Sequence, residues 1–357
     1  MIRSSMAGLL LAHSVATSGA LAQAIDSARV RTVYDAVVAR RNEIERSNGR
    51  FADVDGIRIH YLEWGTANGV PLVWIPGTSS TAYELRSVAP QLVQAGYRVI
   101  AVESRGSGQT RVTDYEFSIQ NIADDLVALL DHLQIRTAVF GGASMGGFIA
   151  AAVYDQHPDR VRGLLMADGG TWSQQWIFDH TDPELSRKRM EWDEMPPDIS
   201  GASEFAVFLQ MAGGRISQSS NTAASIESLL DLLVRINPAG NGRWAFLPRF
   251  TEMVGTTQSN IAGITRPTTL PLLQWSQHAL IPLVVFRRLN VPMMILDPQE
   301  PNDFWPVTDQ NERLARAHPS LVIHRVYPAT NNVAQRPDWL VRDALELLSR
   351  VREGKSR

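Results

Sequence analysis

The sequence of 357 residues is long enough for one large α/β domain with an inserted subdomain. Its formal net charge of −3 and the lack of a basic stripe argue against a nucleic-acid-binding protein. Cysteine is absent, which excludes disulfides, thiolate metal sites and cysteine nucleophiles.

Residues 1–22 have the pattern of a secretory signal peptide. Arg3 is their positive charge, Met6–Val15 is a short apolar stretch, and Ala20-Leu21-Ala22 fits a small-x-small cleavage site. We therefore expect a secreted or periplasmic protein whose mature chain starts at Gln23; the alternative is an ordinary N-terminal segment. No later apolar run reaches the roughly 18 residues that a membrane span requires, so no span is expected.

A helical segment is expected over residues 23–50. Apolar side chains recur there near the 3.6-residue helical period, at Val30, Val33, Val37, Val38 and Ile44. Beyond it, polar and apolar residues alternate over Phe51–Trp64 on both sides of Asp55-Gly56. This alternation predicts a β-hairpin.

From residue 71 onward, short apolar runs alternate with amphipathic segments. Strands are predicted over residues 71–75, 97–102, 161–167, 291–296 and 321–327, and in the apolar run that ends at Gly141. Helices are predicted over residues 81–95, 119–133, 307–318 and 337–351. Strands and helices that alternate in this way predict βα units and a parallel sheet.

The alternation stops between Trp172 and Asn290. This stretch contains several tryptophans and methionines, and Gly, Ser, Asn and Pro occur together in two loops, so we expect a helical cap inserted over the sheet. The expected organisation is then a core in two parts, residues 51–171 and 291–351, around a cap over residues 172–290, with a charged tail over residues 352–357. The aromatic residues either form an apolar ligand pocket or only pack the cap helices.

The most informative stretch is residues 137–152. A short apolar strand is followed by Gly142-Ala143-Ser144-Met145-Gly146 and then by an Ala-rich helical run. This is the G-x-S-x-G pattern of a nucleophile elbow, in which a serine occupies a sharp strand-to-helix turn. The glycines are needed because side chains there would collide where the strand and the helix cross. The alternative is a glycine-rich turn with an inert serine.

From Phe51 to Val351 the chain resembles the α/β-hydrolase family. The similarity is carried by the elbow, by the loop Ile75-Pro76-Gly77-Thr78, which is similar to the family's His-Gly loop, and by residues 103–110, similar to its D-x-R-G-x-G-x-S motif. The resemblance implies an α/β-hydrolase fold: a mostly parallel central sheet flanked by helices, with an inserted helical cap.

The resemblance also implies the roles of particular residues. Ser144 takes the place of the nucleophile, and the backbone N–H groups of Met145 and Thr78 take the place of the oxyanion hole. The first choice for the acid is Asp303, in the turn after a strand and followed by Pro306. The other candidates for the acid are, in order, Glu300, Asp297 and Asp168.

The family's histidine is missing where the resemblance predicts it. Asn331 or Asn332 stands there, and an asparagine amide cannot act as a general base near neutral pH. Two other histidine positions of the family are also changed, to Pro76 and Ala143. A relocated base would have to come from elsewhere, and the candidates are His180, His278 and His324.

Three hypotheses follow for the function. The first is a serine hydrolase that acts on a carboxylic ester, lactone or amide through Ser144. The second is a pseudo-hydrolase that binds a small apolar ligand without turnover, and the third is a lyase or isomerase that uses the same pocket. We expect a small-molecule partner, no metal and no other cofactor, because the spacing of metal ligands does not occur.

Overall fold

The computed structural model describes residues 27–78, 80–110, 112, 117–173, 176, 203–206, 208–209, 216, 222–233, 272–299, 307–328 and 336–353. The helix α1 (Ser27–Asn48) comes first, followed by a hairpin of β1 (Gly49–Val54) and β2 (Ile57–Trp64). The predicted turn lies between these strands: Asp55 and Gly56 both have positive φ, 46° and 81°. Two such residues in succession suit the tight turns that join antiparallel strands.

The central sheet has eight strands in the order β1-β2-β4-β3-β5-β6-β7-β8. After the hairpin come β3 (Val70–Ile75), β4 (Tyr97–Val102), β5 (Ala138–Ala143), β6 (Val161–Ala167), β7 (Met293–Pro298) and β8 (Val322–Tyr327). The pairs β1–β2 and β2–β4 are antiparallel, and every other neighbouring pair is parallel. The predicted mostly parallel sheet is therefore confirmed.

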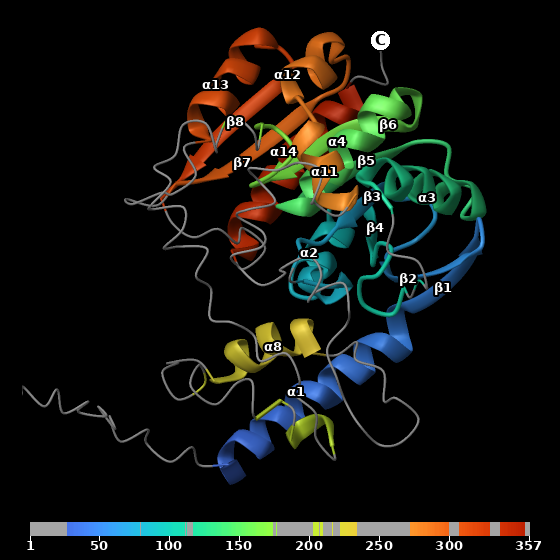
Figure 1. Cartoon of the computed structure of the whole chain (residues 1–357), viewed down its shortest axis with the longest axis vertical. Coiled ribbons are helices and arrows are strands. Elements are labelled where there is room, and N and C mark those ends of the chain that lie inside the picture. The colour runs from blue at the N-terminus through green and yellow to red at the C-terminus, as the bar shows by residue number, and fades with distance from the viewer. Residues whose placement is uncertain are drawn as a thin grey trace, which may run out of the picture.

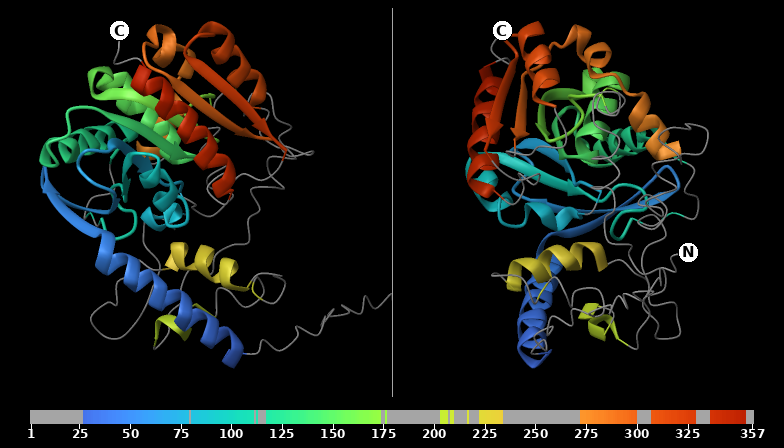
Figure 2. Two further views of the ribbon diagram at one scale, coloured as in Figure 1. Left: turned by 180° about the vertical axis from the view of Figure 1, so that it is seen from behind. Right: turned by 60° about the vertical axis from the view of Figure 1, so that its left-hand side comes forward.

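Helices cover both faces of this sheet (Figure 1, Figure 2). One face packs against α3 (Ile119–His132), α4 (Met145–Gln156) and α13 (Thr308–Ala317). The other face packs against the short helix α2 (Ala89–Gln94), which follows the 3₁₀ turn η1 (Ala82–Leu85), and against α14 (Pro337–Glu353). A second 3₁₀ turn, η2 (Pro158–Arg160), leads into β6. The inner strands are buried on both faces, as in other parallel sheets.

Local sequence fixes where several of these elements begin. Ser118 caps α3 through a reciprocal pair of hydrogen bonds with Asn121, because the first N–H groups of a helix lack partners within the helix. Both α2 and α14 have proline in their first turn, where the missing N–H costs nothing. All six residues of β5, which precedes the predicted elbow, are buried.

The described part of the predicted cap contains α8 (Thr222–Leu233), α11 (Leu272–Ala279), α12 (Pro282–Val285) and the 3₁₀ turn η4 (Phe286–Arg288). Leu273, Leu280 and Phe286 join the core cluster on the α3–α4 face, so α11 and the turns after it pack on the main domain. In contrast, α8 packs beside α1, and the two helices extend away from the sheet (Figure 1, Figure 2).

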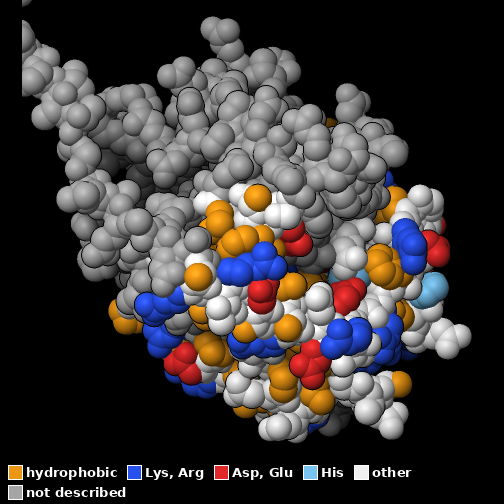
Figure 3. Space-filling model, turned by 90° about the horizontal axis from the view of Figure 1, so that it is seen from below, with side chains coloured by type: hydrophobic (Ala, Val, Ile, Leu, Met, Phe, Trp, Pro, Cys, Tyr) orange, Lys and Arg blue, Asp and Glu red, His pale blue; other side chains and the backbone are white. Residues whose placement is uncertain are grey.

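The surface of the described region carries mixed charge. On the face in Figure 3, basic and acidic side chains are interspersed with apolar ones, without a field of one sign among the coloured residues. Within the ranges given above, none of the helices combines the length and apolar character needed to cross a membrane.

Candidate functional site

Ser144 lies at the apex of the sharp turn between β5 and α4. Its backbone adopts φ 49° and ψ −117°, a conformation that a non-glycine residue rarely occupies. Its side chain is exposed, whereas the residues on either side are buried. Backbone strain of this kind persists only where the surrounding structure enforces it.

Close packing around the turn explains its glycines. A Cβ atom on Gly146 would lie 1.9 Å from the carbonyl oxygen of Ile75, and one on Gly142 would lie 2.4 Å from the carbonyl carbon of Gly146. Neither backbone neighbour can move aside as a flexible side chain could. The strand and the helix therefore cross at a distance that only glycine permits.

A second contact comes from the chain that follows β6. The N–H of Ser144 donates to the carbonyl of Ala167 at 2.8 Å, and a Cβ on Gly169 would lie 2.1 Å from the carbonyl oxygen of Ser144. Asp168, between these residues, has φ 55° and is half-buried. The end of β6 thus holds the serine turn from one side.

The loop after β3 approaches the turn from another side. A Cβ on Gly77 would lie 3.6 Å from the Cβ of Ser144. Within the described residues, the N–H groups of Thr78 and Met145 have no backbone acceptor, and Met145 is the first residue of α4. Two N–H groups close to a serine hydroxyl are suited to stabilise an oxyanion.

Of the four candidate acids, the structure describes two. Asp303 and Glu300 lie outside the described residues, as do Asn331 and Asn332. Asp168 follows β6, next to the glycine that packs on Ser144. Asp297 lies within β7 and not in the turn after it, because the strand continues to Pro298, two residues beyond its predicted end at Leu296.

Asp297 is fully buried and binds a histidine. Its Oδ2 lies 2.7 Å from Nε2 of His324 on β8, and its Oδ1 has no hydrogen-bond partner among the described residues. Three strand spacings of about 4.8 Å separate β8 from β5. The backbone of His324 therefore lies roughly 14 Å across the sheet from β5, the strand that leads to Ser144. The imidazole of His324 therefore hydrogen-bonds to Asp297 and is not within hydrogen-bonding distance of Ser144.

The other two candidate bases differ in how far the structure describes them. His180 lies outside the described residues. His278, on α11, lines a cavity, and burial lowers its pKa to about 4. Its imidazole is therefore neutral at pH 7.

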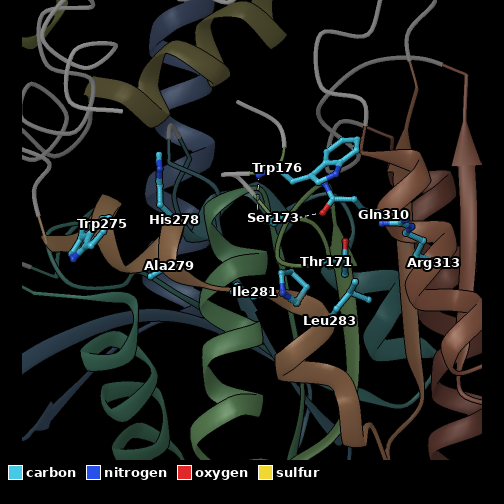
Figure 4. Close-up of a pocket in the computed structure, with 11 residues that line it drawn as sticks. Thr171, Ser173, Trp176, Trp275, His278, Ala279, Ile281, Leu283, Gln310 and Arg313 are labelled. Carbon is cyan, nitrogen blue, oxygen red and sulfur yellow. Dashed lines mark hydrogen bonds between the residues drawn. The ribbon is translucent and has the colours of Figure 1, made fainter. Parts of the chain in front are cut away.

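This cavity has a volume of about 470 Å³ and lies between the chain after β6, α13 and the α11–α12 segment (Figure 4). Thr171 and Ser173 provide one wall, which begins two residues beyond the glycine packed on Ser144. Gln310 and Arg313 on α13 provide another wall. Among the described residues, no group of three or more histidine or acidic side chains could hold a metal ion.

Sequence reasoning did not identify Thr171, Gln310 or Arg313 as site residues. The available signal was weak: Gln310 and Asn311 fall on the buried face of an amphipathic helix, where apolar residues are usual. Their partners come from far along the chain. Thr171 donates to Oδ1 of Asn311 at 2.6 Å, and the N–H of Ser173 donates to Oε1 of Gln310 at 2.9 Å.

Comparison with known proteins matches residues 70–216 to the family model described as the alpha/beta hydrolase fold. A haloalkane dehalogenase from Mycolicibacterium paratuberculosis is 31% identical over 121 residues, which is 33% of this chain and 40% of the relative. The bifunctional epoxide hydrolase 2 of Sus scrofa is 32% identical over 120 residues, 33% of this chain and 21% of the relative. The chain thus spans less than half the length of either relative.

The likeness to solved structures covers more of the chain. The crystal structure of E-2-(acetamidomethylene)succinate hydrolase covers 84% of this chain and 98% of its own, with a TM-score of 0.58 and 16% identity. At this identity the likeness concerns the fold alone. The match in fold extends over both parts of the core, and the family model includes the serine turn, so this chain has the α/β-hydrolase fold.

Proposed function

We propose that this protein is a serine hydrolase that cleaves a carboxylic ester, lactone or amide, with Ser144 as the nucleophile. The observation that carries the proposal is the exposed Ser144, whose backbone has φ 49° in a turn that the backbone of two other segments encloses. A packing role would favour a glycine at this φ, because glycine adopts it without strain. A strained serine with an exposed hydroxyl is consistent with nucleophilic catalysis.

In the proposed reaction, Oγ of Ser144 forms a bond to the carbonyl carbon of the substrate. The resulting oxyanion accepts hydrogen bonds from the N–H groups of Met145 and Thr78, which stabilise charge that is absent from the ground state. The bond to the leaving oxygen or nitrogen breaks, and the leaving group takes the proton given up by Ser144. Water then hydrolyses the acyl-enzyme and releases a carboxylic acid.

We assign the proton transfer to His278. Two features support this choice: His278 lines the cavity whose wall begins two residues beyond Gly169, and burial lowers its pKa to about 4, which keeps it neutral at pH 7. A base with a pKa of about 4 is weaker than an ordinary histidine, so we expect modest turnover that persists into acidic solution.

The test combines covalent labelling with turnover. A fluorophosphonate probe should label the purified protein at Ser144, and p-nitrophenyl esters should be hydrolysed. Ser144→Ala should abolish both signals, whereas Ser349→Ala, on the exposed side of α14, should leave both unchanged. His278→Gln should lower kcat by about 10²-fold or more without loss of the fold.

A different result would favour the alternatives. Absence of a Ser144 adduct, with saturable ligand binding, would identify a pseudo-hydrolase. Turnover that survives Ser144→Ala would point to a lyase or isomerase that uses the same pocket. If Asn331→His or Asn332→His raises esterase activity by orders of magnitude, the base belongs to that segment and not to His278.

A further inference from the structure

The cavity whose wall includes Thr171 and Ser173 has one polar end, formed by α13. Gln310 and Arg313 are three residues apart, so their side chains lie on the same face of the helix. Figure 4 shows both side chains on the α13 side of the cavity, with Ser173 and Trp176 next to Gln310. These two side chains form the polar end of the cavity.

Gln310 has a fixed orientation and unused donors. Its side chain is only 9% exposed, and its Oε1 accepts the N–H of Ser173 at 2.9 Å. This hydrogen bond identifies which end of the side-chain amide is the oxygen, so the amide nitrogen, Nε2, points away from Ser173. Nε2 is buried without a hydrogen-bond partner among the described residues. A buried donor without a partner costs about 1–3 kcal/mol, which an acceptor from a ligand would recover.

Arg313 is the positive charge of the cavity wall. No hydrogen bond or ion pair engages its guanidinium among the described residues, whereas Arg316, on the same helix, binds Glu312 at 2.9 Å. The described lining contains no carboxylate, and His278 is neutral at pH 7 because burial lowers its pKa to about 4. The described lining therefore carries one formal positive charge, at its α13 end, on the exposed side chain of Arg313.

The rest of the cavity wall is apolar. Trp176 borders the polar end, and Trp275, Ile281 and Leu283 line the α11–α12 side (Figure 4). Trp275 is 44% exposed and Ile281 is 53% exposed, so both have apolar surface left for a ligand to cover. Covering such surface contributes about 25 cal/mol per Å².

We propose that this cavity binds a carboxylate with a bulky apolar or aromatic body. The carboxylate would accept hydrogen bonds from the guanidinium of Arg313 and from Nε2 of Gln310, and the body would lie against Trp176 and Ile281. One guanidinium balances the charge of a carboxylate, whereas a phosphate dianion would keep one negative charge without a partner in the described lining. The proposal concerns binding alone and stands whether or not Ser144 is a nucleophile.

Isothermal titration of the purified protein tests this proposal with four probes: 1-naphthylacetate, its neutral amide 1-naphthylacetamide, 1-naphthyl phosphate and acetate. We expect 1:1 binding of 1-naphthylacetate, at least tenfold tighter than that of the amide or the phosphate. Acetate alone should bind at least a hundredfold more weakly, because it lacks the apolar body.

Three variants locate the site. Arg313→Gln should weaken 1-naphthylacetate binding about tenfold or more and leave the neutral amide unchanged. Gln310→Met, which keeps the shape and removes both the donor and the acceptor of the Ser173 N–H, should also weaken binding of the acid. Arg316→Gln is the matched control on the same helix and should have no effect. Ser144→Ala should bind as tightly as the parent, which separates this test from that of the hydrolase activity.

Several outcomes would overturn the proposal: no saturable binding of 1-naphthylacetate, equal affinity for the acid and its amide, or equal effects of Arg313→Gln and Arg316→Gln. Tighter binding of the phosphate would assign the cavity to a different anion.

Discussion

The serine turn depends on contacts at the scale of single atoms. Ser144 has a strained backbone because Gly146 packs on Ile75 and Gly169 packs on Ser144 itself. These are backbone-to-backbone contacts, so no side-chain rotation can relieve a collision there. Gly146 and Gly169 do not have positive φ, so glycine is required at these positions by the short distances alone.

Gly146→Ala should therefore be far more damaging than an ordinary glycine replacement. The new Cβ would lie 1.9 Å from the carbonyl oxygen of Ile75, and we expect a loss of about 3 kcal/mol or more, or failure to fold. Gly56→Ala is the control: its φ is 81° and nothing lies within 4 Å of the new Cβ, so only about 1 kcal/mol of backbone strain is added. Urea unfolding compares them, and equal stability of the two variants would contradict the close crossing of strand and helix.

At the scale of elements, a buried polar cluster joins α1 to the sheet. His60 on β2 is fully buried, with Nδ1 2.7 Å from Oε2 of Glu103 and Nε2 3.0 Å from Oε1 of Glu45. Glu45 also accepts hydrogen bonds from Tyr83 and Gln109. Burial opposes a charge on His60, but the bonds and charges of the two carboxylates outweigh it and raise the pKa of His60 to about 9.

This cluster should make stability depend on pH. Because the folded-state pKa of His60 exceeds the unfolded value of about 6.5, its contribution is complete below pH 6.5 and is lost as the pH rises towards 9. Glu45 acts in the opposite direction. Burial alone would raise its pKa, but its hydrogen bonds, led by that from His60, lower it to about 2, so its contribution is lost only in strong acid.

We therefore expect the free energy of unfolding to fall by a few kcal/mol between pH 6.5 and pH 9. In His60→Gln this decline should disappear, on top of a general loss of stability. The control is His157→Gln, whose pair with Asp124 is partly exposed and should contribute little. Urea unfolding at several pH values measures the decline, and the same slope in parent and His60→Gln would refute the assignment.

At the scale of the whole molecule, α1 connects the sheet to α8. The cluster of Tyr34, Val37, Phe208, Ile226 and Leu230 joins α1 to α8 and the segment before it, apart from the two sheet-associated clusters. Glu227 on α8 adds polar contacts, 2.5 Å to Arg86 and 3.7 Å to Arg40. The apolar cluster is separate from the two cores of the sheet, and the ion pair with Arg86 links α8 to the segment after η1.

Tyr34→Ala should therefore loosen α8 while the sheet stays intact. Tyr34 packs its ring on Phe205 and Phe208, with centroid distances of 5.0 Å and 4.8 Å, and its removal should cost about 2–5 kcal/mol locally. Hydrogen exchange should become faster over residues 222–233 and remain unchanged in β3 to β7. Asn42→Ala, on the exposed side of α1, should alter neither region. Uniformly faster exchange would mean that the cluster is part of the main core.

Much of the architecture could be predicted because local patterns specify it. The hairpin at Asp55-Gly56, the buried strands and the G-x-S-x-G turn all depend on residues that are neighbours in sequence. The end of β7 was mispredicted, because Asp297 and Pro298 look like turn residues and yet pair with β8. Asp297 is buried with His324 as its partner, 27 positions away, and no pattern among neighbouring residues predicts this pairing.

The sequence by itself determined the mostly parallel α/β fold and the serine at the turn between β5 and α4. These follow from short-range patterns, in which a residue's neighbours dictate its conformation. Only the tertiary structure decided that His324 binds Asp297, that His60 lies between two carboxylates, and that Gln310 and Arg313 share a cavity with His278. These pairings join residues from distant parts of the chain, and the close packing that brings them together exists only in the folded state.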